Sequence, residues 1–259
     1  MSVFERCLEK CRARKGVVVY SDGEDRRVVS AAAKLIREGL VEPILIGDPE
    51  KVRTALQESG ETGVSLQVVN PYNPALLQHN AAEYMAIQKA KGKDISEEEA
   101  VKAVKNPLAA GALMVRRGEA EIGVAGNLSS TADVIRAGLR MVGTAAGSKT
   151  VSSFFFMLKD NRVCMFTDCA VIPEPTSAQL ADIAISTADV YKRVMGDEAR
   201  VALLSFSTKG SAKHERVDKV RAALEEIKTR EPNLLVDGEL QLDAAVEPEV
   251  ARLKAPGSP

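Results

Sequence analysis

Short apolar runs alternate with amphipathic segments along the first half of the chain. The apolar runs end in glycine or other turn residues, which is typical of buried strands. The segments between them carry apolar residues three and four positions apart, which is typical of helices. The predicted strands cover residues 17–20, 41–46, 65–70 and 121–126, and the predicted helices cover 25–40, most of 75–118 and 130–142. Strands separated by helices predict layers of parallel α/β structure.

The second half opens with two adjacent strand-like runs. They cover residues 150–158 and 162–171, and the Asp160–Asn161 pair between them suits a hairpin turn. Further segments follow in the order helix 176–195, strand 199–208, helix 214–230 and strand 234–240. We therefore expect an antiparallel edge on an otherwise parallel sheet. Because the pattern changes near Gly147 to Thr150, we predict a first lobe at 1–148 and a second at 149–259.

Composition limits the classes of function. The 259 residues are 45% hydrophobic and 27% charged, with 35 Lys and Arg against 36 Asp and Glu. This balance gives no electrostatic case for binding nucleic acid or a membrane surface, and no apolar run is long enough to span a bilayer. The first residues do not resemble a secretory signal, so we expect a cytoplasmic protein.

Cysteine usage agrees with that expectation. Four cysteines occur, with only two histidines in the chain, which argues against a zinc cluster. Structural disulfides are rare in a reducing compartment. The sequence therefore predicts free, mostly buried thiols at Cys7, Cys11, Cys164 and Cys169.

The end of the fourth predicted strand is the first candidate binding site. Ser129, Ser130 and Thr131 follow this strand, and Arg136 lies in the second turn of the next helix. Ligands of parallel sheets bind at the carboxyl ends of strands, where hydroxyls and helix amides can hold an anion. An arginine adds donors suited to phosphate or carboxylate. A helix cap beside a solvated arginine explains the same pattern equally well.

A second hydroxyl-rich segment, "SFSTKGSAKH", follows the strand near residue 204. Its candidate donors to an anion include Ser207, Thr208, Gly210 and Ser211. The spacing of glycine and lysine does not fit a Walker loop. By itself the pattern favours a flexible polar loop over a binding loop.

Two acidic segments are weaker candidates. Asp168 beside Cys169 suggests a nucleophile, but nothing nearby would lower the thiol pKa, so we favour a structural cysteine. Asp237, Glu239 and Asp243 could form a metal site, although the end of a strand is the simpler interpretation. No G-x-G-x-x-G follows the first strand and no G-x-S-x-G occurs. The residues alone therefore predict a two-lobed α/β protein that binds a small anion.

Several blocks of the sequence resemble one enzyme family. They are "SDGEDRRVVSAAAKL", "NPLAAGALMVRRGEAEIGVAGNLSSTADVIRAGL", "VSSFFFM", "FTDCAVIPEPTSAQLADIAISTA", "VALLSFSTKGSA" and "VDGELQLDAAV…KAPGSP". In register from about Gly16 to the last residue, they resemble the phosphate acetyltransferase and phosphate butyryltransferase family. The details "SSFFFM" and "DCAV" favour the acetyltransferase branch.

The resemblance implies both a fold and a reaction. The fold is two α/β/α lobes with mainly parallel sheets, similar to isocitrate and isopropylmalate dehydrogenases, with the active site in the cleft between lobes. The reaction is reversible transfer of an acetyl group between acetyl-CoA and inorganic phosphate, giving acetyl phosphate and CoA. The CoA thiolate attacks directly, so CoA is a substrate and no cofactor or metal is required. Members assemble as homodimers or larger homo-oligomers.

The resemblance also implies roles for particular residues. Arg136, in the helix that begins "STAD", corresponds to a substrate-binding arginine. Ser130 and Thr131, together with the "SFSTKGS" loop, would cradle the phosphoryl group; the loop residues are Ser207, Thr208, Gly210 and Ser211. Gln88 stands where the family has an arginine.

Family members continue beyond the block that ends this sequence. The second lobe is therefore expected to be shortened, without the Ser-Arg pair and the aspartate that the family uses for CoA binding and thiol deprotonation, which leaves the catalytic residues unknown. Two alternatives to an active acetyltransferase follow. One is an impaired member that binds CoA or an acyl phosphate without turnover, and the other is a phosphate butyryltransferase. A dehydrogenase of this fold ranks lower because no nicotinamide-binding loop is found.

Overall fold

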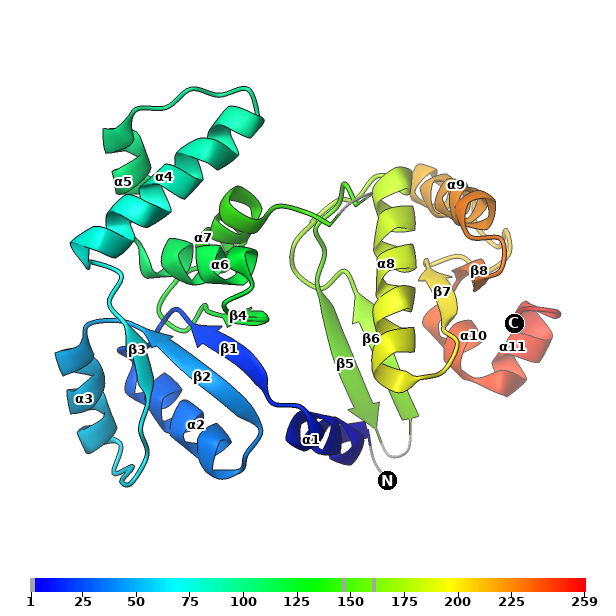
Figure 1. Ribbon diagram of the computed structural model, residues 1–259. Helices are drawn as coiled ribbons and strands as arrows, with labels where there is room; N and C mark the ends of the chain where they lie inside the picture. Colours follow the sequence, from blue (N-terminus) through cyan, green and yellow to red (C-terminus); the bar gives the residue numbers. More distant parts are fainter. Residues whose placement is uncertain (1–2, 146–147, 160–161) are drawn as a thin grey trace. The chain divides into compact units, whose positions relative to one another are not determined.

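The chain folds into two compact units, residues 3–143 and 144–259, in a computed structural model that describes residues 3–145, 148–159 and 162–259 (Figure 1). The lobe boundary expected near Gly147 to Thr150 falls partly on residues 146–147, outside the described residues. Within the described ranges, no helix is long and apolar enough to cross a membrane.

The first unit contains a four-stranded parallel sheet. Its strands are β1 (Gly16–Tyr20), β2 (Val41–Ile46), β3 (Gln67–Val69) and β4 (Ile122–Val124), in the order β3-β2-β1-β4. Its helices are α1 (Val3–Ala13), α2 (Arg26–Arg37), α3 (Pro49–Glu58), α4 (Pro74–Ala90), α5 (Glu97–Val104), α6 (Pro107–Arg117) and α7 (Thr131–Ala137), and α7 continues into a π-helical turn, η1 (Gly138–Val142). The predicted parallel α/β layers are confirmed here.

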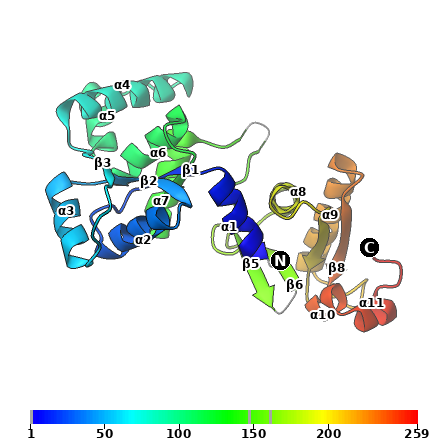
Figure 2. The same ribbon diagram turned by 60° about the horizontal axis from the view of Figure 1, so that its bottom comes forward.

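Helices cover both faces of this sheet (Figure 2). Tyr20 and Leu45 pack with α2 and α3 on one face, whereas Val19 and Ile46 pack with α6 on the other. Successive residues of a strand point to opposite faces, so both parities must be apolar, as the sequence has them. Burying side chains such as Leu45, which is fully buried, stabilises the fold by roughly 1.5–3 kcal/mol each.

Close packing fixes the segment that follows β1. A Cβ atom on Gly23 would lie 2.7 Å from the backbone oxygen of Ile46, and one on Gly111 of α6 would lie 2.5 Å from Ser21 Oγ. The clash at Gly23 is with backbone, so β2 approaches this segment as closely as glycine allows, whereas at Gly111 the hydroxyl of Ser21 would have to move. Ser21 and Asp22 are consequently buried at the carboxyl end of the sheet.

The second unit contains two separate two-stranded sheets in its described part. Strands β5 (Phe154–Lys159) and β6 (Arg162–Thr167) are antiparallel, and β7 (Arg200–Leu204) and β8 (Leu235–Leu240) are parallel. The helices are α8 (Ser177–Met195), α9 (Glu215–Arg230), α10 (Leu242–Val246) and α11 (Pro248–Lys254). The predicted hairpin strands are confirmed, but the hairpin is not the edge of the parallel sheet. Its expected turn at Asp160–Asn161 lies outside the described residues.

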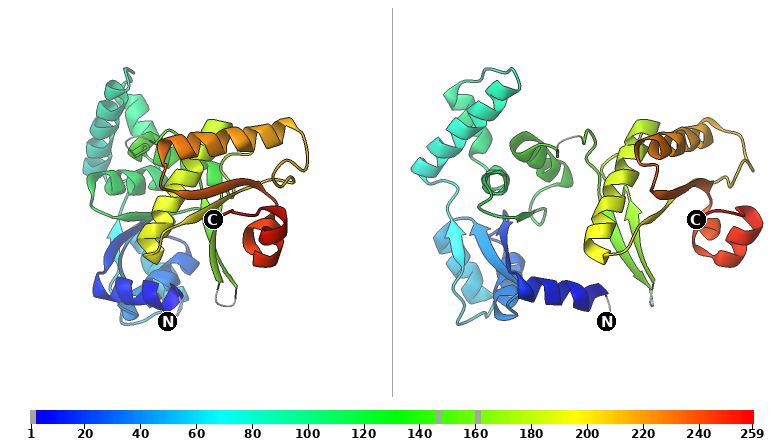
Figure 3. Two further views of the ribbon diagram at one scale, coloured as in Figure 1. Left: turned by 90° about the vertical axis from the view of Figure 1, so that its right-hand side faces the viewer. Right: turned by 45° about the vertical axis from the view of Figure 1, so that its right-hand side comes forward.

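Helices α8 and α9 pack against β7 and β8 (Figure 3). Ala184, Ala223 and Ile227 form the core with Leu203 and Val236. Small side chains on the helices let them lie close to the strands. The amphipathic spacing seen in the sequence therefore faces this core, which holds the carboxyl ends of β7 and β8 in place.

Candidate functional site

The loop after β4 is held by a buried carboxylate from the end of β1. The Oδ2 atom of Asp22 accepts hydrogen bonds from the amides of Gly126, at 2.9 Å, and Asn127, at 2.8 Å. Gly126 has a φ of +103°, which favours glycine. Two strands that are far apart in the sequence thus join their loops through one side chain. The amides of Gly126 and Asn127 therefore already donate hydrogen bonds to a carboxylate of the protein itself.

Asp133 gathers the polar groups at the start of α7. Ser130 caps the helix by accepting a hydrogen bond from the amide of Asp133, and its hydroxyl donates to Asp133 Oδ2 at 2.7 Å. Arg136 donates to Asp133 Oδ1 at 2.5 Å, and its side chain is 52% exposed. The hydrogen bond from Ser130, with the charge and donor of Arg136, lowers the pKa of Asp133. Thr131 is the first helical residue and is exposed.

The loop after β7 folds around the buried carboxylate of Glu239. This side chain lies on β8 and is 2% exposed. Its Oε1 atom accepts hydrogen bonds from Ser207 Oγ at 3.0 Å and from the Gly210 amide at 2.7 Å. Arg221, on α9, donates to both carboxylate oxygens at 2.8 and 3.0 Å. These hydrogen bonds, with that from Arg221 the strongest, lower the pKa of Glu239 to about 2 even though burial opposes the shift.

The backbone amides of this loop also have hydrogen-bond acceptors within the protein. The amide of Lys209 donates to the backbone oxygen of Glu239, that of Thr208 to Ser211 Oγ, and that of Ala212 to Ser207 Oγ. Lys209 has a φ of 48°, which lies in the left-handed region. A loop whose amides already have acceptors is ordered before any ligand arrives. It is therefore not the flexible polar loop that the pattern alone favoured.

Lys209 and Thr208 also hold the loop to β8 and to the residue after it. Lys209 pairs with Asp237 and also donates to the backbone oxygen of Gly238 at 3.3 Å. Burial by itself raises the pKa of Asp237, but the hydrogen bonds from Lys209, Ser258 and the Gly238 amide, with the charge of Lys209, together outweigh burial and lower the pKa. Thr208 Oγ1 accepts from the amide of Gln241 at 2.9 Å. Thr208 is therefore engaged inside the protein, with only 6% of its surface exposed.

Asp168 organises the turn that follows β6. Its carboxylate accepts from both the amide and the hydroxyl of Ser153, and from the amides of Val171 and Ile172. Burial by itself raises the pKa of Asp168. Together these hydrogen bonds outweigh burial and lower the pKa to about 2. Cys169 Sγ donates to the backbone oxygen of Phe166 at 3.1 Å. Cys169 thus has the structural contact expected of it, and the carboxylate of Asp168 holds the turn after β6 in place.

The other cysteines and the acids of β8 and α10 have ordinary structural surroundings. All four thiols are free but only partly buried, so the expectation that most are buried is wrong. Asp237, Glu239 and Asp243 pair with Lys209, Arg221 and Lys254 respectively. Over the described ranges, no three His, Cys, Asp or Glu side chains are placed to hold a metal ion.

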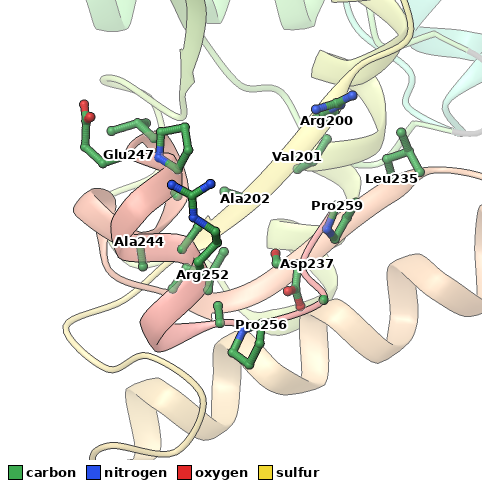
Figure 4. A pocket seen from close by; sticks show the side chains of 18 residues that line it. Arg200, Val201, Ala202, Leu235, Asp237, Ala244, Glu247, Arg252, Pro256 and Pro259 are labelled. Carbon is green, nitrogen blue, oxygen red and sulfur yellow. The ribbon is translucent and has the colours of Figure 1, made fainter.

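An open-sided cavity of about 510 Å³ lies against β7 and β8 and is bordered by α10, α11 and the last residues of the chain (Figure 4). Its lining is mostly apolar, with Val201, Ala202, Leu235 and Ala244 among the contributors. Asp237 lies beside Pro259 in the close-up and is the residue that links the cavity to the loop after β7. No motif in the sequence indicates this cavity, because its walls come from separate strands and helices.

The structure brings the predicted residues together in two groups. Ser130 and Thr131 begin α7 and Arg136 lies in its last turn, and the other group is the loop after β7 with Ser207, Thr208, Gly210 and Ser211. Gln88 is buried on α4, with 7% of its surface exposed. Sequence reasoning missed the carboxylates of Asp22 and Glu239 as organisers of these loops. The available signal was an acidic residue at the end of each neighbouring strand.

Similarity to solved structures defines the class of this protein. A phosphotransacetylase from Streptococcus pyogenes aligns with a TM-score of 0.90 and 38% sequence identity, covering 99% of this chain and 77% of that one. The EutD phosphotransacetylase from Staphylococcus aureus aligns with a TM-score of 0.87 and 33% identity, covering 99% of this chain and 78% of that one. The fold is therefore that of the phosphotransacetylases.

Similarity in sequence agrees. The phosphate acetyltransferase of Thermoanaerobacterium thermosaccharolyticum is 40% identical over 265 aligned residues, covering 100% of this chain and 80% of that protein. The model of the phosphate acetyl/butaryl transferase family matches residues 2–259. The chain belongs to the phosphate acetyl/butaryl transferase family.

Proposed function

We propose that this protein is a phosphate acetyltransferase, which moves an acetyl group reversibly between acetyl-CoA and inorganic phosphate. The observation that carries the proposal is similarity to phosphate acetyltransferases over the whole chain, at 36–40% identity for the first three relatives. These relatives share the activity in their names, and none of the three is named a butyryltransferase. Acetyl is therefore the acyl group that we propose.

In the direction of acetyl-CoA synthesis, the CoA thiolate attacks the carbonyl carbon of acetyl phosphate. A carbon–sulfur bond forms, the bond between that carbon and the bridging oxygen breaks, and inorganic phosphate leaves with the electron pair. Negative charge therefore moves from sulfur to the leaving phosphate. Donors and fixed positive charge near the phosphate stabilise this change, and no protein nucleophile is needed.

We propose that Arg136 supplies the positive charge near the phosphate. Its guanidinium is half exposed and held at one end by Asp133, which leaves further N–H groups to bind phosphate. The carboxylate also restricts the side chain to fewer rotamers, so less entropy is lost when an anion binds. Ser130 and Thr131 lie next to it and are proposed as hydroxyl donors to the same group.

The loop after β7 is the second substrate contact in this proposal. Gly210 and Ser211 are exposed, whereas Ser207 and Thr208 are buried against Glu239 and Gln241. The proposed roles therefore differ. Gly210 and Ser211 present the surface that meets the phosphoryl group, and Ser207 and Thr208 hold that surface in shape.

The remaining proposals concern the setting of the enzyme. CoA, acetyl-CoA, phosphate and acetyl phosphate are its substrates, with CoA a substrate and not a resident cofactor, and no metal is required. Four free cysteines are compatible with a reducing cytoplasm. The β5–β6 hairpin exposes Phe154, Phe155 and Leu158, and such apolar surface is typical of an interface. We propose a homodimer or larger homo-oligomer, which light scattering on the purified protein tests.

The test of function is CoA release from acetyl-CoA and phosphate by the native chain, Arg136→Ala and Arg140→Ala. Arg140 is an exposed arginine on the adjoining η1 and serves as the control for loss of one positive charge. Removing a donor to developing charge costs roughly 10²–10³-fold in turnover, so we expect that loss in Arg136→Ala and less than threefold in Arg140→Ala. Equal losses in both variants would remove Arg136 from the site. CoA binding without turnover in the native chain would replace the proposal by a CoA-binding module.

A further inference from the structure

The loop from Ser207 to Ala212 is ordered around a carboxylate of the protein itself. Each backbone amide in this range donates to an acceptor within the protein. Two acceptors belong to Glu239, because its carboxylate takes the Gly210 amide and its backbone oxygen takes the Lys209 amide. A phosphate cannot be bound by the amides of this range unless those bonds break.

We infer that Glu239 is a positioning residue, which fixes Gly210 and Ser211 in the conformation that meets the phosphoryl group of the substrate. The inference rests on the proposed function for the identity of the substrate, but the conformational effect does not. Glu239 does not touch the substrate in this account. It acts through the loop.

The geometry separates this role from ordinary burial of an ion pair. Arg221 contacts both oxygens of Glu239 from α9, and Ser207 and Gly210 contact the Oε1 oxygen from the loop. Ser207 Oγ links Glu239 to the end of the loop, because it also lies 3.3 Å from Ser211 Oγ and accepts a hydrogen bond from the Ala212 amide at 3.1 Å. The donors from α9 and from the loop share Oε1, but they have different roles. Arg221 compensates the charge of the carboxylate, and the loop is shaped by it.

Two substitutions distinguish the effect of Glu239 on the loop from its ion pair with Arg221. Glu239→Gln keeps the shape of the side chain but turns one carboxylate oxygen into a donor, so Ser207, Gly210 and Arg221 can no longer all be satisfied. Arg221→Gln removes the guanidinium and leaves the carboxylate with its loop donors. Both variants lower stability, because each breaks a pair whose carboxylate is buried. Only the first should disturb the loop.

Hydrogen exchange and phosphate binding measure the loop without any turnover. In Glu239→Gln we expect the Gly210 amide to exchange at least tenfold faster than in the native chain, and in Arg221→Gln less than threefold faster. Titration with inorganic phosphate, followed by the amide resonance of Ser211, should give at least tenfold weaker binding in Glu239→Gln alone. Unchanged exchange at Gly210 in Glu239→Gln, or equal weakening in both variants, would overturn the positioning role.

Steady-state kinetics add a readout that lost stability does not produce. We expect the KM for phosphate to rise about tenfold in Glu239→Gln with kcat within threefold, and KM to stay within threefold in Arg221→Gln. A merely structural role would lower the active fraction, and hence kcat, at unchanged KM, and that result would overturn the inference. Glu225→Gln on α9, an exposed acid paired with Lys228, is the control for the charge change.

Two outcomes need a separate design. If Glu239→Gln does not fold, Ser207→Ala carries the same test, because it removes the hydroxyl that links Glu239 to Ser211. If the native chain shows no turnover, the proposed function fails, and the exchange and phosphate-binding experiments still decide the inference. Phosphate that leaves the Ser211 resonance of the native chain unmoved would overturn it.

Discussion

Replacing Glu239 by glutamine should change how the stability of the second unit depends on pH. The pKa of this carboxyl is lowered from its ordinary value of 4.5 to about 2 in the folded protein. In the native chain the unfolded state therefore binds a proton more readily than the folded state below pH 4.5. The stabilisation from Glu239 is complete above that pH and is lost as the pH falls toward 2, whereas glutamine does not titrate.

The magnitude follows from the size of the shift. One pKa unit corresponds to about 1.4 kcal/mol, so the depression to about 2 gives about 3 kcal/mol. Because the side chain of Arg221 is 42% exposed, solvent screening reduces its share, and we expect about 2–3 kcal/mol. The difference in unfolding free energy between native chain and variant should narrow by about 1 kcal/mol between pH 6.5 and 3.5.

Urea-dependent hydrogen exchange of peptides from 200–240, measured at several pH values, gives this difference for the second unit alone. That choice matters because two compact units need not unfold together. Glu225→Gln, which removes an exposed acid from the adjacent helix, is the matched control for the loss of one negative charge. A gap between native and Glu239→Gln that stays constant from pH 6.5 to 3.5 would refute the assignment of a depressed pKa to this carboxyl.

Two further predictions test the packing around the loops. Gly238→Ala places a Cβ atom 2.8 Å from Leu203 Cβ and 3.1 Å from its backbone oxygen, so it should destabilise the second unit by about 1–3 kcal/mol, read from the urea midpoint of the same peptides. Asp22→Ala removes the acceptor of the Gly126 and Asn127 amides, and their exchange should accelerate about 10- to 100-fold, since a hydrogen bond to a charged group is worth roughly 1.5–3 kcal/mol. Unchanged exchange at both amides would show that the loop after β4 is held by its other contacts.

An internal carboxylate explains why hydroxyl-rich loops are ambiguous in sequence. The loop after β7 has the residue types of an anion site, and the structure shows that an anion is indeed enclosed, namely the side chain of Glu239. The same holds on a smaller scale for Asp22 and the amides of Gly126 and Asn127. Donor-rich segments therefore indicate that an anion lies close, without telling whether it is a ligand or a residue of the protein.

Local patterns predicted the elements better than they predicted how the elements assemble. Ser96 and Glu99 have the spacing of a capping box in the sequence and form both of its hydrogen bonds at the start of α5, because the two residues lie within one turn. Two hairpin strands were also predicted, at 150–158 and 162–171, and β5 and β6 lie within or close to these ranges, but their expected place at the edge of the parallel sheet was wrong. Strand pairing between distant segments depends on tertiary packing, which no local pattern records.

The sequence by itself determined the type and order of most elements, although not the helix α3, and it determined the parallel sheet of the first unit and, through long blocks in register, the family. These properties are carried by apolar periodicity and by extended similarity, which need no coordinates. Only the tertiary structure decided which side chains order the candidate loops. Asp22 lies 104 residues from Gly126, and Glu239 lies 29 residues from Gly210. Hydrogen bonds depend on separations in space of about 3 Å, and the fold alone brings such distant residues within that distance.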